Sequence, residues 1–559
     1  LTNGATLANG DTSGGGVWCA SRSSVVSNCW IVGNTAATLG GGVYGGTLID
    51  CALSGNRVDD SSVDNSGGAA ASSTLISSRI ADNVAPKGGG VSGSVLYNCA
   101  VLGNSAIAQY GGGAYDSHLN NCAVYGNSAA VSGGGTFGGE VKNCTLSGNS
   151  AYEGGGAYGG RLRNCIIYYN TAIIGSNYRD VYTYLKYCST APAASGSGNI
   201  SSPPSLASPS HISTNSPCVA KGSAEYASGL DIDAERWEAT PSIGCDEPNV
   251  NSATGALSGV IEAEFTRIPT AFEAKFTALI EGRATCSVWD FGDGTIITNE
   301  PYASHRWATN GSYAVILTAW NTEHLSGVSY TTMVAVVEQP VYYVDVGNPT
   351  PLFPYTSWET AATNIQDAIN ADGTVGGRLV LVMDGVYKDG GTVGYGATSN
   401  RVALTSAVTV RSVNGPNVTA IEGKGPLGAG AMRAAYVGKD CVLSGFTLTN
   451  GATGINGSFQ ELAGGGGYCD IGAMLSNCYV VGNAAYSAAG VYGGVLLNCR
   501  VEGNSAARNG GGVYYSFANG CVIKGNVGSA LSNGSGGGAN QRDRKSTRLN
   551  SSPGKLSRL

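Results

Sequence analysis

One short acidic stretch of the chain, RVDDSSVDN at residues 57–65, has the side chains that bind a hard cation. Carboxylate oxygens are the ligands that Ca²⁺ prefers in proteins, and Asp59, Asp60 and Asp64 supply them here. Calcium is therefore the one cofactor that the sequence suggests, and no other cofactor is expected. A solvated loop that holds no ion is the alternative interpretation of the same residues.

Aromatic residues that recur after glycine-rich runs have the side chains that bind sugar rings. They end the strings GGGVY, GGGAY, GGGTF and GGGAY, and are Tyr44, Tyr115, Phe137 and Tyr158. Rings that point outward from a regular fold offer an apolar surface on which a sugar can lie. If the same rings point inward they belong to the core, and the sequence leaves both interpretations open.

Four charged residues on two neighbouring repeats, Glu140, Lys142, Arg161 and Arg163, occupy nearly equivalent positions. Together they could face a sugar acid across the repeats. Pairing of opposite charges between the repeats is the plainer account of these residues.

Conventional catalytic and metal-binding motifs are absent from the sequence. The histidines do not lie at metal-binding spacings with cysteine or with one another: His118, His211, His305 and His324. The acidic group Asp231, Asp233 and Glu235 is another candidate site, although it also suits a polar closing segment. No Gly-x-Ser-x-Gly, phosphate-loop or dinucleotide motif occurs in a suitable context. We therefore predict no catalytic residue, and we expect a non-enzymatic role more than an enzymatic one.

The elements that position these side chains follow a repeat of about 22 residues, which a ladder of cysteines marks. Its members lie 21–27 residues apart, with Ser78 in place of one of them: Cys29, Cys51, Cys99, Cys122, Cys144, Cys165 and Cys188. An asparagine lies five residues after each member except the last, and an aliphatic residue lies three residues before each. A second aliphatic residue lies two residues after nearly every member and shares a strand face with it, so a corner must precede the cysteine.

The repeat predicts short strands joined by bends, with successive coils stacked about 4.8 Å apart. Leucine and cysteine would fill the interior, and the asparagine amides would hydrogen-bond along a ladder. This pattern resembles the right-handed parallel β-helix proteins of the pectate-lyase-like superfamily, over about 1–250 and 341–541. Pectin-degrading members use paired aspartates with a histidine, or a calcium-binding acid cluster with Arg or Lys, and neither set matches residue by residue. A polysaccharide lyase or glycoside hydrolase of this type is the alternative function.

A large duplication underlies the repeat, because the opening LTNGATLANG recurs as LTNGATGING at 448–457. We expect two β-helix segments, the first N-truncated and the second C-truncated. In the second, Ala361–Ile369 has helical spacing with Ile365, Ala368 and Ile369 on one face. It predicts a helix that caps the open end of the β-helix.

The first segment ends in a closing segment at 216–249, where two cysteines lie off the ladder. A disulfide between Cys218 and Cys245 would pin this segment, and two free thiols are the other interpretation.

Residues 255–338 change in character, and the string WDFGDG at 289–294, His305 and GSYAVILTAWN at 311–321 follow one another. These strings resemble the PKD domain, which implies an immunoglobulin-like β-sandwich found in extracellular proteins. We expect four residues in its core: Trp289, Tyr313, Val315 and Leu317. Asp290 and Asp293 suit a tight turn, with calcium binding as the alternative.

The predicted organisation is an all-β chain with a first β-helix at 1–250, a sandwich at 251–339 and a second β-helix at 340–541. The run DRKSTRLNSS at 543–552 resembles a translated sequencing adapter, so we interpret 542–559 as a non-native tail. The net charge is −7, and the tail is basic, so the body is more acidic than this total. An acidic body argues against a nucleic-acid partner.

No apolar run is long enough to span a membrane as a helix. These features predict a secreted or cell-surface bacterial protein with a structural or adhesive role. Its expected partner is a polysaccharide or cell-surface glycan.

Overall fold

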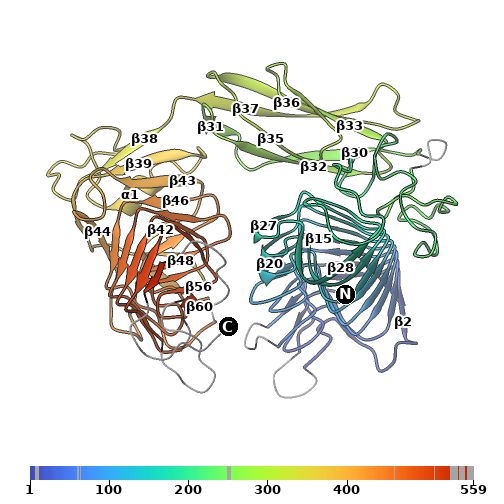
Figure 1. Cartoon of the computed structure of the whole chain (residues 1–559), viewed down its shortest axis with the longest axis horizontal. Helices are drawn as coiled ribbons and strands as arrows, with labels where there is room; N and C mark the ends of the chain where they lie inside the picture. Colours follow the sequence, from blue (N-terminus) through green and yellow to red (C-terminus); the bar gives the residue numbers. More distant parts are fainter. Residues whose placement is uncertain are drawn as a thin grey trace. The chain divides into compact units, whose positions relative to one another are not determined.

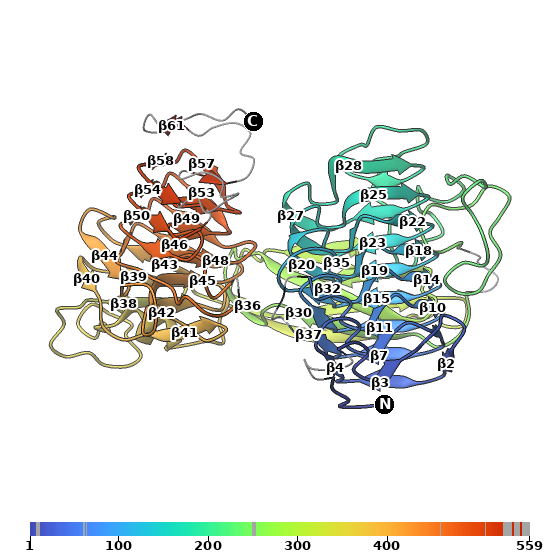
Figure 2. The same ribbon diagram turned by 90° about the horizontal axis from the view of Figure 1, so that it is seen from below.

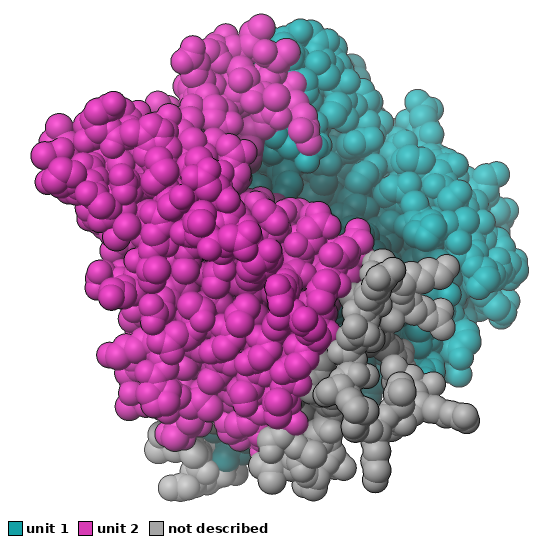
Figure 3. Space-filling model, turned by 60° about the vertical axis from the view of Figure 1, so that its left-hand side comes forward, with its two compact units in different colours: residues 1–264, 273–305, 313–333 teal, residues 265–272, 306–312, 334–559 magenta. Residues whose placement is uncertain are grey.

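The computed structural model describes residues 1–6, 12–59, 62, 64–248, 253–458, 460–508 and 510–528, and the backbone of 539–540 and 548–550. Nearly all regular structure in these residues is β-strand. The chain divides into two compact units, which Figure 3 colours separately. The first consists of residues 1–264, 273–305 and 313–333, and the second of residues 265–272, 306–312 and 334–559.

A parallel β-helix forms most of the first unit, and its strands stack coil upon coil in Figures 1 and 2. One sheet has two rows of strands, which merge at β25 (Ala157–Arg163) and β28 (Tyr178–Lys186). The first row is β1 (Val17–Trp18), β5 (Val43–Tyr44), β9 (Ala70–Ala71), β13 (Val91–Ser92), β17 (Ala114–Tyr115) and β21 (Thr136–Phe137). The second row is β2 (Val25–Ser27), β6 (Thr47–Ile49), β10 (Thr74–Ile76), β14 (Val95–Tyr97), β18 (His118–Asn120) and β22 (Glu140–Lys142).

Two further parallel sheets complete the coils. One is β3 (Trp30–Val32), β7 (Ala52–Ser54), β11 (Arg79–Ala81), β15 (Ala100–Leu102), β19 (Ala123–Tyr125), β23 (Thr145–Ser147), β26 (Ile166–Tyr168) and β29 (Ser189–Thr190). The other is β4 (Thr35–Ala36), β8 (Arg57–Val58), β12 (Val84–Ala85), β16 (Ser105–Ala106), β20 (Ser128–Ser132), β24 (Ser150–Glu153) and β27 (Thr171–Ile174). Equivalent residues of successive coils lie opposite one another, as Leu48, Leu75 and Leu96 do. The predicted β-helix and its register are confirmed.

Left-handed residues turn the chain at two corners that recur beside the ladder cysteines and the ladder asparagines. The residue before each ladder position has a positive φ of 46–54°: Asn28, Asp50, Ser77, Asn98, Asn121, Asn143, Asn164 and Tyr187. Asparagine tolerates this conformation better than most residues, which explains the recurrent Asn-Cys pair. A second positive-φ residue, often glycine as at Gly55 and Gly126, precedes each ladder asparagine. The corner predicted before the cysteine is therefore confirmed.

The predicted asparagine ladder runs through the first β-helix. From Asn34 to Asn170, each amide Nδ2 donates to Oδ1 of the ladder asparagine in the next coil at 2.9 Å. The same Oδ1 also accepts the backbone N–H of the preceding asparagine at 2.9–3.0 Å. These side chains are buried, so the ladder satisfies polar groups that water cannot reach.

The cysteine ladder lines the core with free thiols. Each Sγ lies 3.0–3.3 Å from the carbonyl oxygen two residues earlier, which belongs to the strand before the corner. Ser78 makes the same contact through Oγ at 2.9 Å. A small side chain with a donor suits this position, and serine replaces cysteine because it supplies both properties.

An antiparallel β-sandwich follows the first β-helix. One sheet is β30 (Ser258–Ala263), β32 (Ala274–Glu281) and β35 (Tyr302–His305). The other is β31 (Arg267–Pro269), β37 (Val328–Val337), β36 (Gly311–Trp320), β33 (Cys286–Asp290) and β34 (Ile296–Thr298). Trp289, Val315 and Leu317 are fully buried, as predicted, whereas Tyr313 is only half-buried.

The second unit contains another parallel β-helix with three main sheets. The first is β38 (Val341–Val344), β39 (Arg378–Val382), β43 (Val408–Ser412), β46 (Val442–Ser444), β49 (Met474–Ser476), β53 (Val495–Leu497) and β57 (Phe517–Asn519). The second is β40 (Gly385–Tyr387), β44 (Thr419–Glu422), β47 (Thr447–Thr449), β50 (Tyr479–Val481), β54 (Arg500–Glu502), β58 (Val522–Lys524) and β61 (Arg548–Asn550).

The third main sheet is β41 (Thr392–Tyr395), β42 (Thr398–Leu404), β45 (Arg433–Val437), β48 (Gly467–Cys469), β52 (Val491–Tyr492), β56 (Val513–Tyr514) and β60 (Ala539–Asn540). A smaller sheet is β51 (Ala484–Ala485), β55 (Ser505–Ala506) and β59 (Val527–Gly528). Most of the interpreted tail, 542–559, lies outside the described residues, and the backbone of β61 pairs with β58.

The predicted capping helix is α1 (Ile365–Asn370), which packs on strands of the second β-helix. Its buried face includes Ile365, Ala368 and Ile369, as predicted. It begins four residues later than predicted, because Asn364 has an extended backbone and accepts the N–H of Gln366 as the N-cap.

Candidate functional site

The acidic stretch begins with β8, and Asp59 and Asp64 are the two of its three aspartates that the structure describes. The Asp64 carboxylate accepts a hydrogen bond from the Lys87 ammonium at 2.8 Å, which holds the pKa of Asp64 below its usual value. Asp59 is exposed, and Asp60 lies outside the described residues. Calcium binding by Asp59, Asp60 and Asp64 stays a prediction, and the Lys87 charge next to Asp64 opposes it.

The recurrent aromatic residues point away from the interior of the β-helix. Their strand neighbours, which face the other way, are buried: Val43, Ala114, Thr136 and Ala157. The aromatic side chains themselves are half-buried on the outer face of the sheet. Of the two directions that the sequence left open, the structure therefore has the rings pointing outward.

Most of these rings stack on one another. Phe137 lies 5.5 Å from Tyr115 and 5.1 Å from Tyr158 between ring centroids, with interplanar angles of 13° and 3°. Stacked rings cover each other's faces and leave mainly their edges to solvent, so this column is poorly suited to stack on sugars. Tyr44 lies outside the stack, opposite Trp18 and Ala71. Ligand binding by the four residues stays a prediction.

A different part of the outer face gathers exposed tyrosines and positive charges. In register, Arg161 lies opposite Glu140 and Tyr184, and Arg163 lies opposite Lys142 and Lys186. We call this surface, with the exposed Tyr182 included, the basic–tyrosine face. Its residues are Lys142, Arg161, Arg163, Tyr182, Tyr184 and Lys186.

The side chains of the basic–tyrosine face are partly paired. Glu140 forms ion pairs with Arg163 and, at 3.4 Å, with Lys142. Arg163 also lies over the ring of Tyr226, 5.1 Å from its centroid. Charge pairing across the coils therefore occurs at Glu140, while Arg161 and Lys186 are exposed. Sequence reasoning missed Tyr182 and Tyr184, although the alternation in YRDVYTYLK, with Leu185 buried, indicates that both point outward.

The acidic group of the closing segment is mainly structural. Buried Asp231 accepts the backbone N–H groups of Asp233, Glu235 and Glu247 at 3.0, 2.7 and 3.0 Å. Glu235 pairs with Arg283 at 2.6 Å. The polar closing segment that the sequence suggested accounts for these contacts.

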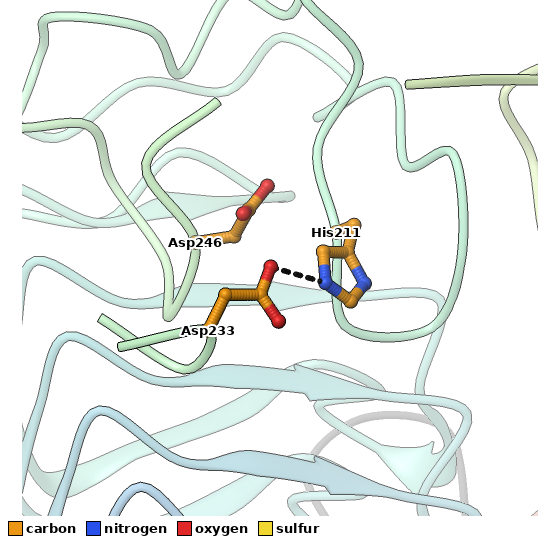
Figure 4. Close-up of side chains that lie close together, drawn as sticks. All are labelled: His211, Asp233 and Asp246. Carbon is orange, nitrogen blue, oxygen red and sulfur yellow. Dashed lines mark hydrogen bonds and ion pairs between the residues drawn. The ribbon is translucent and has the colours of Figure 1, made fainter. Parts of the chain in front are cut away.

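Sequence reasoning also missed a cluster formed by His211, Asp233 and Asp246, which Figure 4 shows side by side. His211 Nε2 lies 2.9 Å from Asp233 Oδ2. Burial lowers the pKa of His211, but the hydrogen bond with Asp233 and the charges of Asp246 and Asp233 outweigh burial and raise that pKa to about 9. Burial raises the pKa of Asp246 to about 7. The three residues of this cluster lie far apart in the sequence, so no motif spacing points to them.

The two off-ladder cysteines have free thiols in the structure, so the predicted bridge between Cys218 and Cys245 is not formed there. Cys218 packs in an apolar cluster with Ile166, Leu206, Ile212 and Ile243. The Cys245 thiol instead lies 3.2 Å from the Ser210 carbonyl oxygen and 3.3 Å from Thr145 Oγ1.

Most of the antiparallel sandwich matches a known domain family. Residues 263–334 match the PKD domain. No curated protein matches the chain. The part of the chain that the structure describes contains no helix able to cross a membrane.

The aspartates of the PKD domain cap its turn. Asp290 Oδ1 accepts the Gly292 N–H at 2.9 Å, and Asp293 Oδ1 accepts the Thr295 N–H at 3.0 Å. Asp293 Oδ2 lies 2.7 Å from His305 Nε2. These contacts give both aspartates the turn role that the sequence predicted. A PKD domain in a chain of parallel β-helices suggests an extracellular structural or adhesive protein.

Proposed function

We propose that this protein is an extracellular adhesin that binds acidic glycans through the basic–tyrosine face of its first β-helix. The observation that carries the proposal is the joint exposure of tyrosine rings and positive charges on neighbouring coils. Tyr182 and Tyr184 are 68% and 67% exposed, and Arg161 lies directly opposite Tyr184.

Sugar recognition needs both kinds of side chain. An exposed tyrosine ring offers an apolar face and a hydroxyl group, whereas Arg and Lys pair with carboxylate or sulfate groups. Lys142, Arg163 and Lys186 follow one another at the spacing of coils, about 4.8 Å. An extended acidic polysaccharide lying along the axis would meet one positive charge per coil.

Weak contacts of this kind add up when the ligand is long, because later contacts become intramolecular. An adhesive role agrees with this mode of binding better than catalysis, which needs a convergent acid and base at one point.

The test is a glycan array followed by calorimetry with an acidic oligosaccharide and a neutral one of equal length. We expect the acidic ligand to bind more tightly, and Tyr184→Ala and Arg161→Ala each to weaken it by about 1 kcal/mol or more, the threshold of a contributing contact. Tyr97→Ala removes another exposed tyrosine from the same sheet and serves as the matched control.

Binding that is absent, or unchanged in the double variant Arg161→Ala/Tyr184→Ala, would refute the proposed face. A reducing-sugar assay on the same samples tests the rival function, since sustained release of reducing ends would identify an enzyme.

A further inference from the structure

We propose that His211, Asp233 and Asp246 bind a divalent transition-metal ion, with Zn²⁺ the expected one, that joins the loops closing the first β-helix. One donor atom of each side chain lies within 4.8 Å of the other two. Asp233 and Asp246 lie in the closing segment and His211 lies just before it, and the three side chains come from separate stretches of the chain, as Figure 4 shows.

The charge balance around the cluster favours a cation. Three carboxylates here are almost fully buried: Asp231, Asp246 and Glu247. Asp231 accepts three backbone N–H groups, and Glu247 accepts the N–H and hydroxyl of Ser242 at 2.8 and 2.7 Å. A buried carboxylate is costly unless such partners compensate for lost water.

Asp246 is the carboxylate with the fewest partners. Its Oδ2 accepts the backbone N–H of Ile212 at 2.9 Å, and its Oδ1 has no hydrogen-bond donor among the described residues, although the side chain is 95% buried. The nearby Arg283 pairs with Glu235 at 2.6 Å and with Asp233 Oδ2 at 3.6 Å and donates to the Asp233 carbonyl oxygen at 2.7 Å, so its charge lies beside Glu235 and Asp233 rather than Asp246. A bound cation would supply the missing partner of Asp246.

The position of His211 matches that of a metal ligand. Its Nδ1 lies 3.0 Å from Ser208 Oγ and 2.9 Å from Ser210 Oγ, which leaves Nε2 directed at Asp233. Metal-binding histidines almost always have such an outer partner on the second ring nitrogen. A small cavity of about 20 Å³ adjoins His211, Asp233 and Asp246, which is enough for one ion or water molecule.

The donor set selects the metal. An imidazole nitrogen with two carboxylates suits Zn²⁺ and its neighbours, whereas Ca²⁺ prefers oxygen ligands throughout. Bonds of about 2.0–2.2 Å to Zn²⁺ require the donor atoms to lie roughly 3.4 Å apart. His211 Nε2 and Asp233 Oδ2 lie 2.9 Å apart, so these two atoms have to separate by about 0.5 Å and the Asp246 oxygen has to take up the same spacing from both.

The experiment uses the full chain without a histidine tag. The zinc content after dialysis against Zn²⁺ is measured by mass spectrometry, and calorimetry with ZnCl₂ gives the affinity. We expect one Zn²⁺ at this site, with His211→Ala and Asp246→Asn each weakening it by at least about tenfold, the loss that even an outer-shell partner causes. The matched control His118→Ala removes an exposed histidine and should bind as the wild type does.

Two further measurements separate this site from adventitious binding. Co²⁺ in place of Zn²⁺ should give a visible spectrum without a thiolate charge-transfer band, because the cysteines are not ligands. Asp246→Asn preserves the side-chain shape, so it tests the site even if His211→Ala fails to fold. The proposal is overturned if the wild type binds no Zn²⁺, if Asp246→Asn binds it equally well, if a thiolate band appears, or if CaCl₂ binds as tightly.

Discussion

Replacing one asparagine of the buried ladder should destabilise the first β-helix far more than replacing an asparagine on its outer face. Asn127 is fully buried, and its Oδ1 accepts both the backbone N–H and the side-chain Nδ2 of Asn104 at 3.0 and 2.9 Å. Its own Nδ2 donates to Asn149 Oδ1 and to the Val101 carbonyl oxygen, both at 2.9 Å. Asn127→Ala therefore leaves the buried backbone N–H of Asn104 without its acceptor, whereas Asn104 Nδ2 loses one bond and keeps those to the Ile80 and Leu102 carbonyl oxygens at 2.9 and 3.0 Å.

One buried donor left unsatisfied costs about 1–3 kcal/mol and the other hydrogen bonds lost add about 1 kcal/mol, so we expect a loss of about 2–4 kcal/mol. Coils contact mainly their neighbours, so the effect should be local. Hydrogen-exchange mass spectrometry can measure it as faster exchange in peptides covering β15 and β19. At about 1.4 kcal/mol per tenfold change, opening should become about 30- to 700-fold more frequent.

Asn120→Ala is the control for this prediction, because Asn120 lies in β18 on the outer face and is half-buried. Its effect should stay within about 0.5 kcal/mol. Equal exchange in Asn127→Ala, Asn120→Ala and the wild type would show that the ladder contributes little to stability.

Three further predictions concern the thiols, the aromatic stack and the PKD turn. Of the 16 cysteines, only Cys29 and Cys286 are not buried. A thiol reagent should therefore label two cysteines rapidly in the native protein and all 16 in denaturant. Rapid labelling of the buried ladder thiols in the native protein would contradict their packing. Phe137→Ala loses stacking on Tyr115 and Tyr158 and should cost about 2 kcal/mol in a denaturant titration, whereas Tyr44→Ala, outside the stack, should cost less. Although partial burial raises the pKa of Asp293, its hydrogen bond with His305 holds that pKa below the usual value. The stability from this pair is therefore present above about pH 4 and lost as the pH falls through the lowered pKa of Asp293. Asp293→Asn should flatten the acidic side of a curve of unfolding free energy against pH. An acidic side that is the same in the variant and the wild type would contradict this prediction.

The regular part of the fold could be predicted because each inward position repeats. A side chain at one place in a coil meets the same side chain in the next coil, so the sequence carries the same information many times. The cysteine and asparagine ladders and the corner before each cysteine all follow from this register. The direction of the recurrent aromatics also has a signal in hindsight, because the preceding residue in each string is the small or β-branched Val43, Ala114, Thr136 or Ala157.

The candidate sites could not be predicted to the same extent, because they lie where the repeat ends or does not constrain the side chain. His211, Asp233 and Asp246 belong to a segment without regular strands, where spacing says nothing about distance. The start of α1 depended on the backbone of Asn364, which the spacing of apolar residues does not reveal. The cysteines of the closing segment were likewise ambiguous, since a pair of cysteines in a sequence carries no geometry.

The contrast between the two faces of one strand row supports the choice of the basic–tyrosine face. Along β6, β10, β14, β18, β22, β25 and β28, the inward column consists of leucines and one valine. The outward column beside it changes from Thr and Val to His118, Glu140, Arg161 and Tyr184 over the same coils. Packing requires uniformity inside and places no such demand outside, so the outward change has to be explained by solubility or by a ligand. Solubility accounts for the charges, but it does not account for two tyrosines that are two-thirds exposed beside them, and a surface that binds sugars accounts for both.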